Sequence, residues 1–427
     1  MKFAMDDEHK AVAKLKVVGV GGAGGNAVNR MVLSGLKGVD FIAVNTDALA
    51  LRHNPAEVKI QIGTTLTRGL GAGANPQMGM LSMQEDRERV REQLEGADMV
   101  FIAAGMGGGT GTGAAPVVAE IAREMDILTV AVVTKPFAWE GPVRDRNAQA
   151  GLDALRRVAD TVIVVPNQKL LSVVEKTTTM RAAFAMADEI LISAVRGISE
   201  IILKHGDIQV DFADVRTIMA QGGDALMGMG RASGENKATV AADRAIHSPL
   251  LDNVNIAGAT GVLVNITGGE DLGLTDVNDA MNAIYEAVGT GVQANIIFGT
   301  VVNPDLHDEI AITVIATGFA NSAGPRSSAS PARDTFRRTG TVALTPRLSS
   351  DVDTGVSEFS ETSEDLGKVP FGARAVTRHS ALRADEDSEP AARRSAFSNP
   401  FSSRSRVVEA EPDIDYETPA FLRNQAD

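Results

Sequence analysis

The sequence predicts an α/β protein: a doubly wound parallel-sheet domain, then a long central helix, a second α+β domain and a disordered tail. Three observations support this. Short runs rich in Val and Ile alternate with amphipathic segments over residues 15–171. Two of these runs end in glycine-rich loops that open a helix. A long apolar segment of helical periodicity then separates this region from the rest. Such alternation is typical of parallel sheets covered by helices.

Five segments in the first region have the length and composition of buried strands. Each is bounded by Gly, Asn or Pro, and apolar residues recur at helical spacing between them. The expected strands are residues 16–20, 41–45, 99–104, 128–133 and 161–165, and the expected helices include 26–36, 80–94 and 114–125. We therefore expect an N-terminal extension at residues 1–14 and a first domain at residues 15–177.

The segment 178–205 is expected to be a single central helix. It is apolar around much of its circumference, which is typical of a helix buried between two units. A C-terminal domain with a mixed sheet is expected at residues 206–320. Its predicted strands are 261–267, 296–302 and 309–317, and its predicted helices are 235–247 and 275–288.

The composition changes at Asn321. Residues 321–408 contain 16 Ser and show no apolar periodicity. Such a segment cannot bury enough apolar surface to offset its ordering entropy, so it is expected to be a disordered linker. Residues 409–427 contain six acidic residues and one Arg around the sequence PAFLR. That pattern indicates either a tethered recognition peptide or a tail that binds nothing.

The composition excludes several classes of function. The 427 residues include no Cys, which excludes disulfides, thiolate metal sites and cysteine nucleophiles, and they include six His without paired spacing. A net charge of −14 argues against a general nucleic-acid binder. No apolar run is long enough to span a membrane, and the N-terminus is too polar for a signal peptide. A cytoplasmic protein is expected.

The first glycine-rich loop spans residues 19–26 and contains the pattern G-x-G-x-x-G at Gly19, Gly21 and Gly24. Glycines let the backbone approach a phosphate, and a helix N-terminus supplies free N–H donors. Asp47 ends the next strand, about where a dinucleotide-binding fold places its ribose-binding acid. An NAD-dependent oxidoreductase is therefore one candidate.

The second glycine-rich loop favours a different ligand. Residues 107–113 read GGGTGTG, five glycines and two hydroxyl side chains. Two such loops at neighbouring strand ends suggest that one di- or triphosphate is held from both sides. No Lys lies in either loop, so this is not a P-loop NTPase. The alternative is that the glycines only permit tight packing of helix on sheet.

These loops belong to a longer resemblance to the tubulin/FtsZ family, and within it to the bacterial cell-division GTPases. It rests on VGVGGAGGNAVNRM, FIAVNTDA, RGLGAGANP, FIAAGMGGGTGTGAAPVVA, VDFADVRTIM, DEIAITVIATGF and the terminal PAFLR. It covers about residues 15–320 and resumes in the tail. The resemblance implies a tubulin-like fold, GTP and GDP as ligands, and self-assembly into filaments. It also implies Mg²⁺, for which it assigns no protein side chain as a ligand.

The resemblance also assigns nucleotide contacts. The implied contacts are Gly22, Ala23, Gly24, Gly25, Asn26, Ala72, Gly73, Ala74, Asn75, Gly107, Gly108, Gly109, Thr110, Gly111, Thr112, Gly113, Glu140, Arg144, Asn167, Phe184 and Asp188. Residues 72–75 would sense the γ-phosphate, and Glu140 and Arg144 would contact ribose and phosphate, although residues so spaced often form only a surface ion pair. Asp188 would accept both guanine N–H donors, which adenine lacks.

Asp211 and Asp214 are the catalytic residues that the resemblance implies. An Asp at a helix start with a second acid three residues later is by pattern a helix cap. In this family, however, the loop enters the nucleotide site of the next subunit, where its acids orient the attacking water. Gln209 stands where the family usually has Asn, so slower or differently tuned hydrolysis is a hypothesis.

We therefore expect a self-assembling GTPase of the division ring under the inner membrane. Membrane-tethering and regulatory division proteins would bind through Pro419, Phe421, Leu422 and Arg423, with Glu417 where the family peptide has Asp. Neither nucleic-acid binding nor membrane insertion is expected. Besides the oxidoreductase, a filament protein that hydrolyses little GTP and a tubulin-like relative with another task remain alternatives.

Overall fold

The computed structural model describes residues 13–319, except residues 173, 176, 205, 252–255 and 290–293. The predicted linker and the recognition peptide with its contacts Pro419, Phe421, Leu422 and Arg423 lie outside the described residues, as does most of the predicted N-terminal extension. None of the described helices is both long enough and apolar enough to cross a bilayer.

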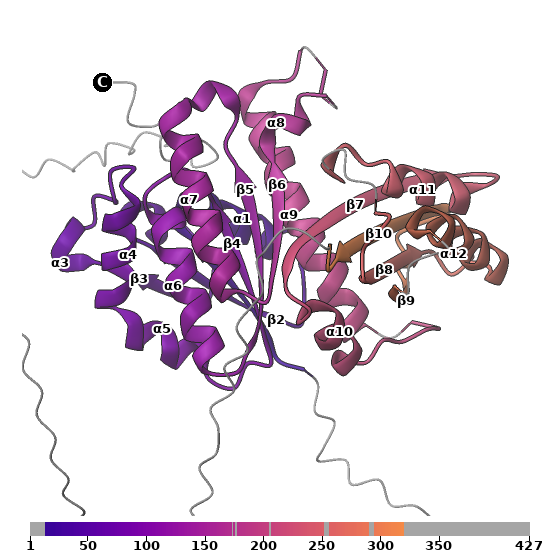
Figure 1. The fold of residues 1–427 in the computed structure, drawn as a ribbon, viewed down its shortest axis with the longest axis horizontal. Helices are drawn as coiled ribbons and strands as arrows, with labels where there is room; N and C mark the ends of the chain where they lie inside the picture. The colour runs from indigo at the N-terminus through magenta and orange to yellow at the C-terminus, as the bar shows by residue number, and fades with distance from the viewer. Residues whose placement is uncertain are drawn as a thin grey trace, which may run out of the picture. The chain divides into compact units, whose positions relative to one another are not determined.

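A parallel sheet forms the first half of the described chain, as predicted (Figure 1). Its strands are β1 (Leu15–Val20), β2 (Val39–Asn45), β3 (Val58–Gln61), β4 (Met99–Gly105), β5 (Leu128–Lys135) and β6 (Thr161–Pro166). Their spatial order is β3-β2-β1-β4-β5-β6. The order therefore changes direction between β1 and β4, which is where parallel α/β sheets bind ligands.

The helices of this half differ from the expected ones mainly at their ends. They are α1 (Gly21–Leu33), α2 (Ala48–Arg52), α3 (Thr64–Thr67), α4 (Pro76–Glu85), α5 (Arg87–Leu94), α6 (Thr110–Glu124), α7 (Pro142–Val158) and α8 (Asn167–Leu170), with a 3-10 turn η2 (Ala138–Glu140). The prediction of a single helix at residues 80–94 is wrong, because α4 and α5 are separate helices. Asp86 interrupts it with a non-helical backbone, and its carboxylate accepts a hydrogen bond from the Gly63 N–H at 2.8 Å.

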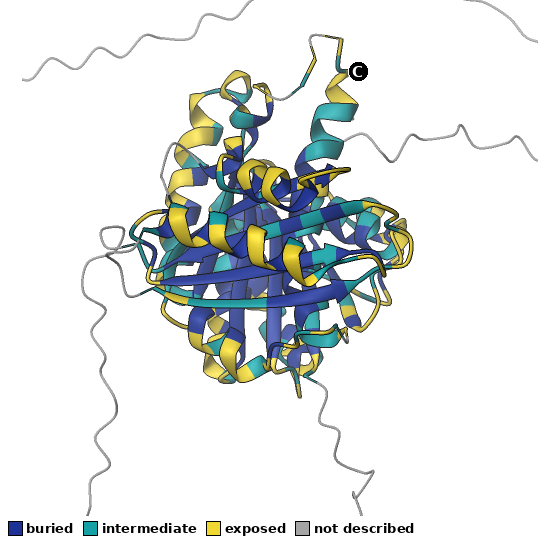
Figure 2. Ribbon diagram, turned by 90° about the vertical axis from the view of Figure 1, so that its right-hand side faces the viewer, coloured by how far each residue is buried: buried dark blue, intermediate teal, exposed yellow. Residues whose placement is uncertain are grey.

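The two faces of the sheet bury separate sets of side chains. Successive residues of a strand point to opposite faces. Val17 and Phe101 pack with α1 and the central helix, whereas Val18 and Ile102 pack with α4 to α7. Figure 2 shows the strands as buried and the helices with exposed residues on their outer sides.

The predicted central helix is confirmed as α9 (Met180–Leu203). The Thr179 hydroxyl caps its start by accepting a hydrogen bond from the Ala182 N–H at 3.2 Å. The helix packs against α1, β5 and β6 of the first half and against strands of the second. Its apolar circumference is therefore buried on both sides, as the sequence predicted.

The second half continues the same sheet. Its elements are α10 (Phe212–Met219), β7 (Gly223–Ser233), α11 (Lys237–Ile246), η3 (Pro249–Leu251), β8 (Gly261–Gly268), α12 (Leu274–Val288), β9 (Asn295–Val302) and β10 (Glu309–Thr317). Strand β7 pairs in parallel with β6 and in antiparallel with β10, which makes one ten-stranded sheet. The sequence did not predict β7, because its glycines interrupt the apolar alternation. Gly228 is needed there, since a Cβ atom on it would lie 2.0 Å from the Ala245 oxygen of α11.

Candidate functional site

Two helix N-termini meet at the carboxyl edge of the parallel strands. Helix α1 begins directly after β1, and α6 begins five residues after β4, the strand paired with β1. A helix N-terminus offers unpaired N–H groups and the positive end of the helix dipole. The predicted contacts at 22–26 form the first turn of α1, and those at 110–113 form the first turn of α6. Two such N-termini side by side have the donors that an anion with two or more phosphates needs.

Three predicted loops lie against one another at this edge. A Cβ atom on Gly21 would come within 2.8 Å of the Gly111 nitrogen, so the first and second glycine loops touch. A Cβ on Gly109 would lie 2.8 Å from the Ala72 Cβ and 2.9 Å from the Asn75 nitrogen. The structure thus brings residues 21–26, 72–75 and 107–113 together. Within residues 72–75, Gly73 and Ala74 are exposed.

The glycines of residues 107–113 serve two different purposes. A Cβ on Gly113 would lie 1.9 Å from the Pro76 oxygen, and one on Gly111 would lie 2.6 Å from the Gly105 oxygen. For Gly111 and Gly113, the alternative that the glycines permit tight packing is therefore correct. Gly107 has a left-handed φ of 107°. Gly108 has neither constraint, since a Cβ there would meet no atom of the described chain within 4 Å. Its small size leaves open space that a phosphate could fill.

Substituting Gly108 and Gly113 should separate ligand binding from folding. We expect Gly108→Ala to change the melting temperature little and to weaken GTP binding about tenfold or more, because the added methyl enters the phosphate space. Gly113→Ala overpacks α6 against α4 at a cost of about 1–3 kcal/mol, which lowers the melting temperature by several degrees. Calorimetric melting and titration with GTP test both. Unchanged GTP affinity in Gly108→Ala would contradict the assignment.

The second glycine-rich loop, residues 107–113, is called the phosphate loop below. Its two threonine hydroxyls have partners within the protein. The Thr112 Oγ1 accepts a hydrogen bond from the Gly107 N–H at 2.8 Å, and the Thr110 Oγ1 lies 2.7 Å from the Thr46 Oγ1. These hydroxyls therefore hold the shape of the loop. Sequence reasoning assigned no role to Thr46. Its only sequence signal is its position at the end of β2, beside the strand that carries the first loop.

Glu140 and Arg144 form an ion pair of 3.1 Å beside the phosphate loop. The other Glu140 oxygen accepts a hydrogen bond from the Phe137 N–H at 2.9 Å, and the Glu140 side chain is only 6% exposed. A Cβ on Gly107 would lie 2.9 Å from the Arg144 oxygen, so the first turn of α7 touches the phosphate loop. The pair is thus held in place, and not a flexible surface contact.

An aromatic cluster continues the site toward α9. Phe137 stacks on Trp139 at a centroid distance of 5.5 Å, and Phe184 meets Phe137 edge-on, also at 5.5 Å. Phe184 is half-buried, and Trp139 is 51% exposed. An exposed edge of this cluster can support a base, in keeping with Phe184 as one of the implied nucleotide contacts.

Asn167 and Asp188 are buried polar groups without a complete set of protein partners. Asn167 is 5% exposed, and its Oδ1 has no hydrogen-bond partner among the described residues. Asp188 is 8% exposed and pairs with the Arg30 Nε at 3.2 Å. An unpartnered buried acceptor costs about 1–3 kcal/mol, which a ligand donor would recover. Sequence reasoning missed Arg30, because it lies 158 positions away on another helix.

Burial raises the pKa of Asp188 to about 7, against the opposing effect of the Arg30 guanidinium. Guanine would donate two hydrogen bonds to the ionised carboxylate and lower its pKa again. Below pH 7, binding must then release a proton, so affinity for GDP should fall up to about tenfold per pH unit and level off above pH 7. Arg30→Gln removes the opposing charge and should move this midpoint to higher pH. A flat affinity profile from pH 6 to 8 would contradict the guanine contact.

Asp211, Asp214 and Gln209 lie at the opposite edge of the sheet. Helix α10, which begins after Asp211, is tied to the amino ends of β5 and β6: the Arg216 Nη2 contacts the Asp126 Oδ1 at 3.3 Å, and the Thr161 hydroxyl donates to the Met219 oxygen. The glycine loops lie at the carboxyl ends. Seven-residue β4 separates the two edges by about 20 Å at ~3.3 Å per residue.

Asp211 and Asp214 are exposed. The predicted helix cap is present in position but not in hydrogen bonding. Asp211 occupies the N-cap position of α10, but its side chain makes no capping hydrogen bond. Within the described residues neither its carboxylate nor that of Asp214 has a hydrogen bond or ion pair. Both are therefore available to a partner.

Asp47 does not support the oxidoreductase alternative. Its Oδ1 accepts hydrogen bonds from the Leu49 and Ala50 N–H groups at 2.9 and 3.0 Å, which caps α2. The carboxylate already stabilises a helix start.

Comparison with known proteins agrees with this geometry. The model of the Tubulin/FtsZ family GTPase domain matches residues 14–175, and the FtsZ family C-terminal domain matches residues 223–320. An empty FtsZ dimer from M. jannaschii is 45% identical over 72% of this chain and 88% of that chain, with a TM-score of 0.69. CetZ2 from Haloferax volcanii, solved as a GTPγS-bound protofilament, is 26% identical over 72% of this chain and 94% of its own, with a TM-score of 0.62. CetZ1 from the same organism, a GDP-bound monomer, covers 72% of this chain and 95% of its own at 22% identity and a TM-score of 0.63, and shares the fold. The chain therefore belongs to the tubulin/FtsZ family of GTP-binding, filament-forming GTPases.

Proposed function

We propose that this protein assembles head to tail into filaments and hydrolyses GTP at the contact between subunits. The observation that carries the proposal is the separation of the phosphate loops from Asp211 and Asp214 by the length of the parallel strands. A subunit cannot bring its own acids to its own nucleotide across that distance. In a head-to-tail stack, the acids of one subunit would meet the nucleotide of the next, and an unclosed contact of this type gives a filament.

Within a subunit, the carboxyl edge of the sheet would hold GTP. The N–H groups at the starts of α1 and α6 would bind the phosphates, with Ala72, Gly73, Ala74 and Asn75 near the γ-phosphate. Asp188 and Asn167 would bind the guanine edge, and Phe184 would support its face. Glu140 and Arg144 would lie at the ribose and the phosphates. The unpartnered Asn167 oxygen and the open space at Gly108 support this fit.

The chemistry would need an oriented water molecule and neutralised phosphate charge. Asp211 and Asp214 would orient the water, with Gln209 placed to tune its position, as in phosphoryl transfer generally. Residues 21–26 and 107–113 include no Lys, Arg or carboxylate, so Mg²⁺ fits the site through phosphate oxygens and water, and not through protein ligands. Bound there, it would offset phosphate charge.

In the cell, we place the protein in the cytoplasm, at the division ring under the inner membrane. The FtsZ matches and the PAFLR sequence support this role. Membrane-tethering and regulatory division proteins would bind Pro419, Phe421, Leu422 and Arg423. A filament with little hydrolysis is the second candidate, because Gln209 replaces the usual Asn and the CetZ relatives also form this fold.

The first test is phosphate release from GTP with Mg²⁺ over a series of protein concentrations, with light scattering alongside. We expect hydrolysis per subunit to appear above a threshold concentration, together with scattering. Activity proportional to protein from the lowest dilution, without scattering, would show a self-contained active site. Scattering without phosphate release would favour the second candidate.

A further inference from the structure

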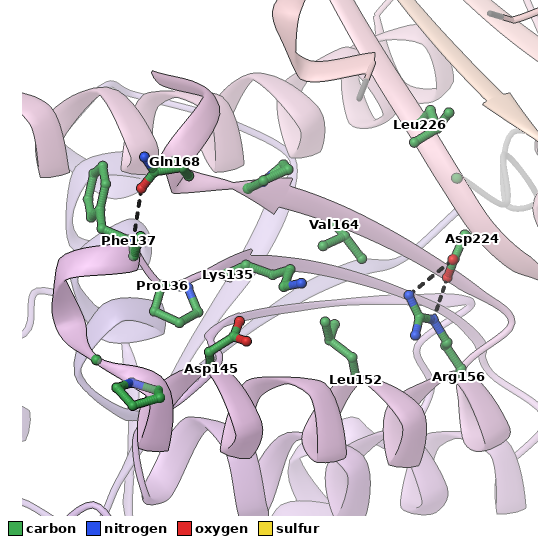
Figure 3. A pocket seen from close by; sticks show the side chains of 15 residues that line it. Lys135, Pro136, Phe137, Asp145, Leu152, Arg156, Val164, Gln168, Asp224 and Leu226 are labelled. Atoms are coloured by element: carbon green, nitrogen blue, oxygen red, sulfur yellow. Dashed lines mark hydrogen bonds and ion pairs between the residues drawn. The ribbon is translucent and has the colours of Figure 1, made fainter. Parts of the chain in front are cut away.

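A cavity lies along α7, apart from the two glycine-rich loops. It has a volume of about 550 Å³, and none of residues 21–26 and 107–113 lines it. Its walls come from α7, from the ends of β5 and β6, and from the start of β7 (Figure 3). The cavity therefore joins the region matched by the GTPase model to the region matched by the C-terminal model. Volumes of about 300–1,000 Å³ and positions between domains are typical of small-molecule sites.

Two opposite charges face this cavity without a partner. Lys135 ends β5 and is half-buried, and Asp145 lies on the first turn of α7 and is exposed. In Figure 3 their side chains enter the space from opposite walls, the strand and the helix. Neither side chain has a hydrogen bond or an ion pair within the part of the chain that the structure describes. A half-buried ammonium without a partner is costly, and a ligand anion would remove that cost.

The other charged or hydrogen-bonding side chains that line the cavity already have partners. Arg156 donates to both oxygens of Asp224, at 2.6 and 3.0 Å. The Gln168 oxygen accepts a hydrogen bond from the Ala138 N–H at 2.9 Å. Lys135 and Asp145 thus remain as the complementary pair that a ligand could satisfy.

The rest of the lining is largely apolar. Leu152 of α7, Val164 of β6 and Leu226 of β7 contribute the aliphatic part of the wall, and Pro136 and Phe137 close one end. An apolar group in this space would gain about 25 cal/mol for each Å² of surface removed from water.

We propose that this cavity binds a small zwitterion with an apolar body, of the kind represented by an apolar amino acid. Its carboxylate binds the Lys135 ammonium, its ammonium binds the Asp145 carboxylate at the mouth, and its side chain packs on Leu152, Val164 and Leu226. A simple anion fits less well, because Asp145 would repel it. A simple cation fits less well, because it leaves Lys135 unpaired.

Three probes and two charge-removing variants of the full-length protein test the site. The probes are L-phenylalanine, N-acetyl-L-phenylalanine, which lacks the ammonium, and L-phenylalaninamide, which lacks the carboxylate. Ligand-observed NMR should show L-phenylalanine binding the wild type most tightly. Lys135→Met should weaken binding of L-phenylalanine and the N-acetyl probe about tenfold, and it should strengthen binding of the cationic amide, which no longer leaves an ammonium unpaired. Asp145→Asn should weaken binding of L-phenylalanine and the amide, and it should strengthen binding of the anionic N-acetyl probe because the repelling charge is gone.

A folded, GTP-binding Lys135→Met or Asp145→Asn protein makes either result interpretable. Absence of binding by all three probes to the wild type would overturn the proposal. The same holds if both variants bind all three probes as the wild type does. A filling variant, Val164→Phe, should exclude every probe by occupying the apolar space, and unchanged binding there would place the probes elsewhere.

Discussion

At a GTP concentration too low to fill the Gly108→Ala site, mixing Asp211→Ala subunits with Gly108→Ala subunits should give more GTP hydrolysis than the sum of the two variants alone. The first keeps an intact nucleotide site but lacks an acid, and the second keeps the acids but binds GTP poorly. Loss of a water-orienting group typically costs 10²–10⁴-fold in rate. In a random equimolar head-to-tail filament, up to about a quarter of the contacts would combine the two intact halves. Phosphate release from the mixture, against each variant at the same total concentration, measures this recovery.

The double variant Asp211→Ala/Gly108→Ala is the control for the mixing experiment. Mixed with either single variant it offers no contact with both halves intact, so no recovery is expected. A mixture of the single variants that is only as active as their sum would show that the acids do not act on a neighbour's nucleotide. Full activity of Asp211→Ala alone would remove the residue from the catalytic assignment.

Asp188→Asn should change the base preference from guanine to xanthine. The Asp188 carboxylate accepts hydrogen bonds only, which suits the guanine N1–H and 2-amino donors. An Asn at this position accepts one bond and donates one, which suits the xanthine N1–H and the oxygen at C2. Hydrogen bonds to a charged partner contribute about 1.5–3 kcal/mol each, so we expect GTP affinity to fall about 10²-fold or more and XTP affinity to rise. Competition between the two nucleotides in equilibrium binding measures the ratio.

Glu189→Gln is the matched control for this exchange. Glu189 adjoins Asp188 but is exposed, so removing its charge should leave GTP preferred over XTP. Equal loss of GTP preference in both variants would mean that local charge, and not contact with the base, sets the specificity. A folded Asp188→Asn protein that still prefers GTP would place the base elsewhere.

The sequence predicts the parts of the site that depend on local patterns. Strands rich in Val and Ile and the glycine loops after β1 and β4 follow from residues close together in the chain, and the structure confirms them. The acids at 211 and 214 are identifiable only through family resemblance, because a helix cap has the same local pattern. The structure adds that Asp211 makes no cap bond.

Other features depend on contacts that no local pattern records. Arg30 forms an ion pair with Asp188, and Thr46 forms a hydrogen bond with Thr110. Both contacts join segments that are far apart in the sequence. Asp86 follows the end of α4, and its carboxylate accepts a hydrogen bond from the Gly63 N–H. Strand β7 joins two sheets into one while containing too many glycines to resemble a strand. Such features are decided by tertiary packing, which overrides local propensity.

The placement of phosphate loops and acids at opposite edges of one sheet gives every assembled subunit a direction. In a filament built on this contact, each subunit acts on the nucleotide of one neighbour, and its own nucleotide is acted on by the other. The last subunit at one end therefore holds GTP that no neighbour can attack, while the last subunit at the other end exposes unused acids. The two ends differ chemically even though all subunits are identical. Subunits would then be added to and lost from the two ends at different rates.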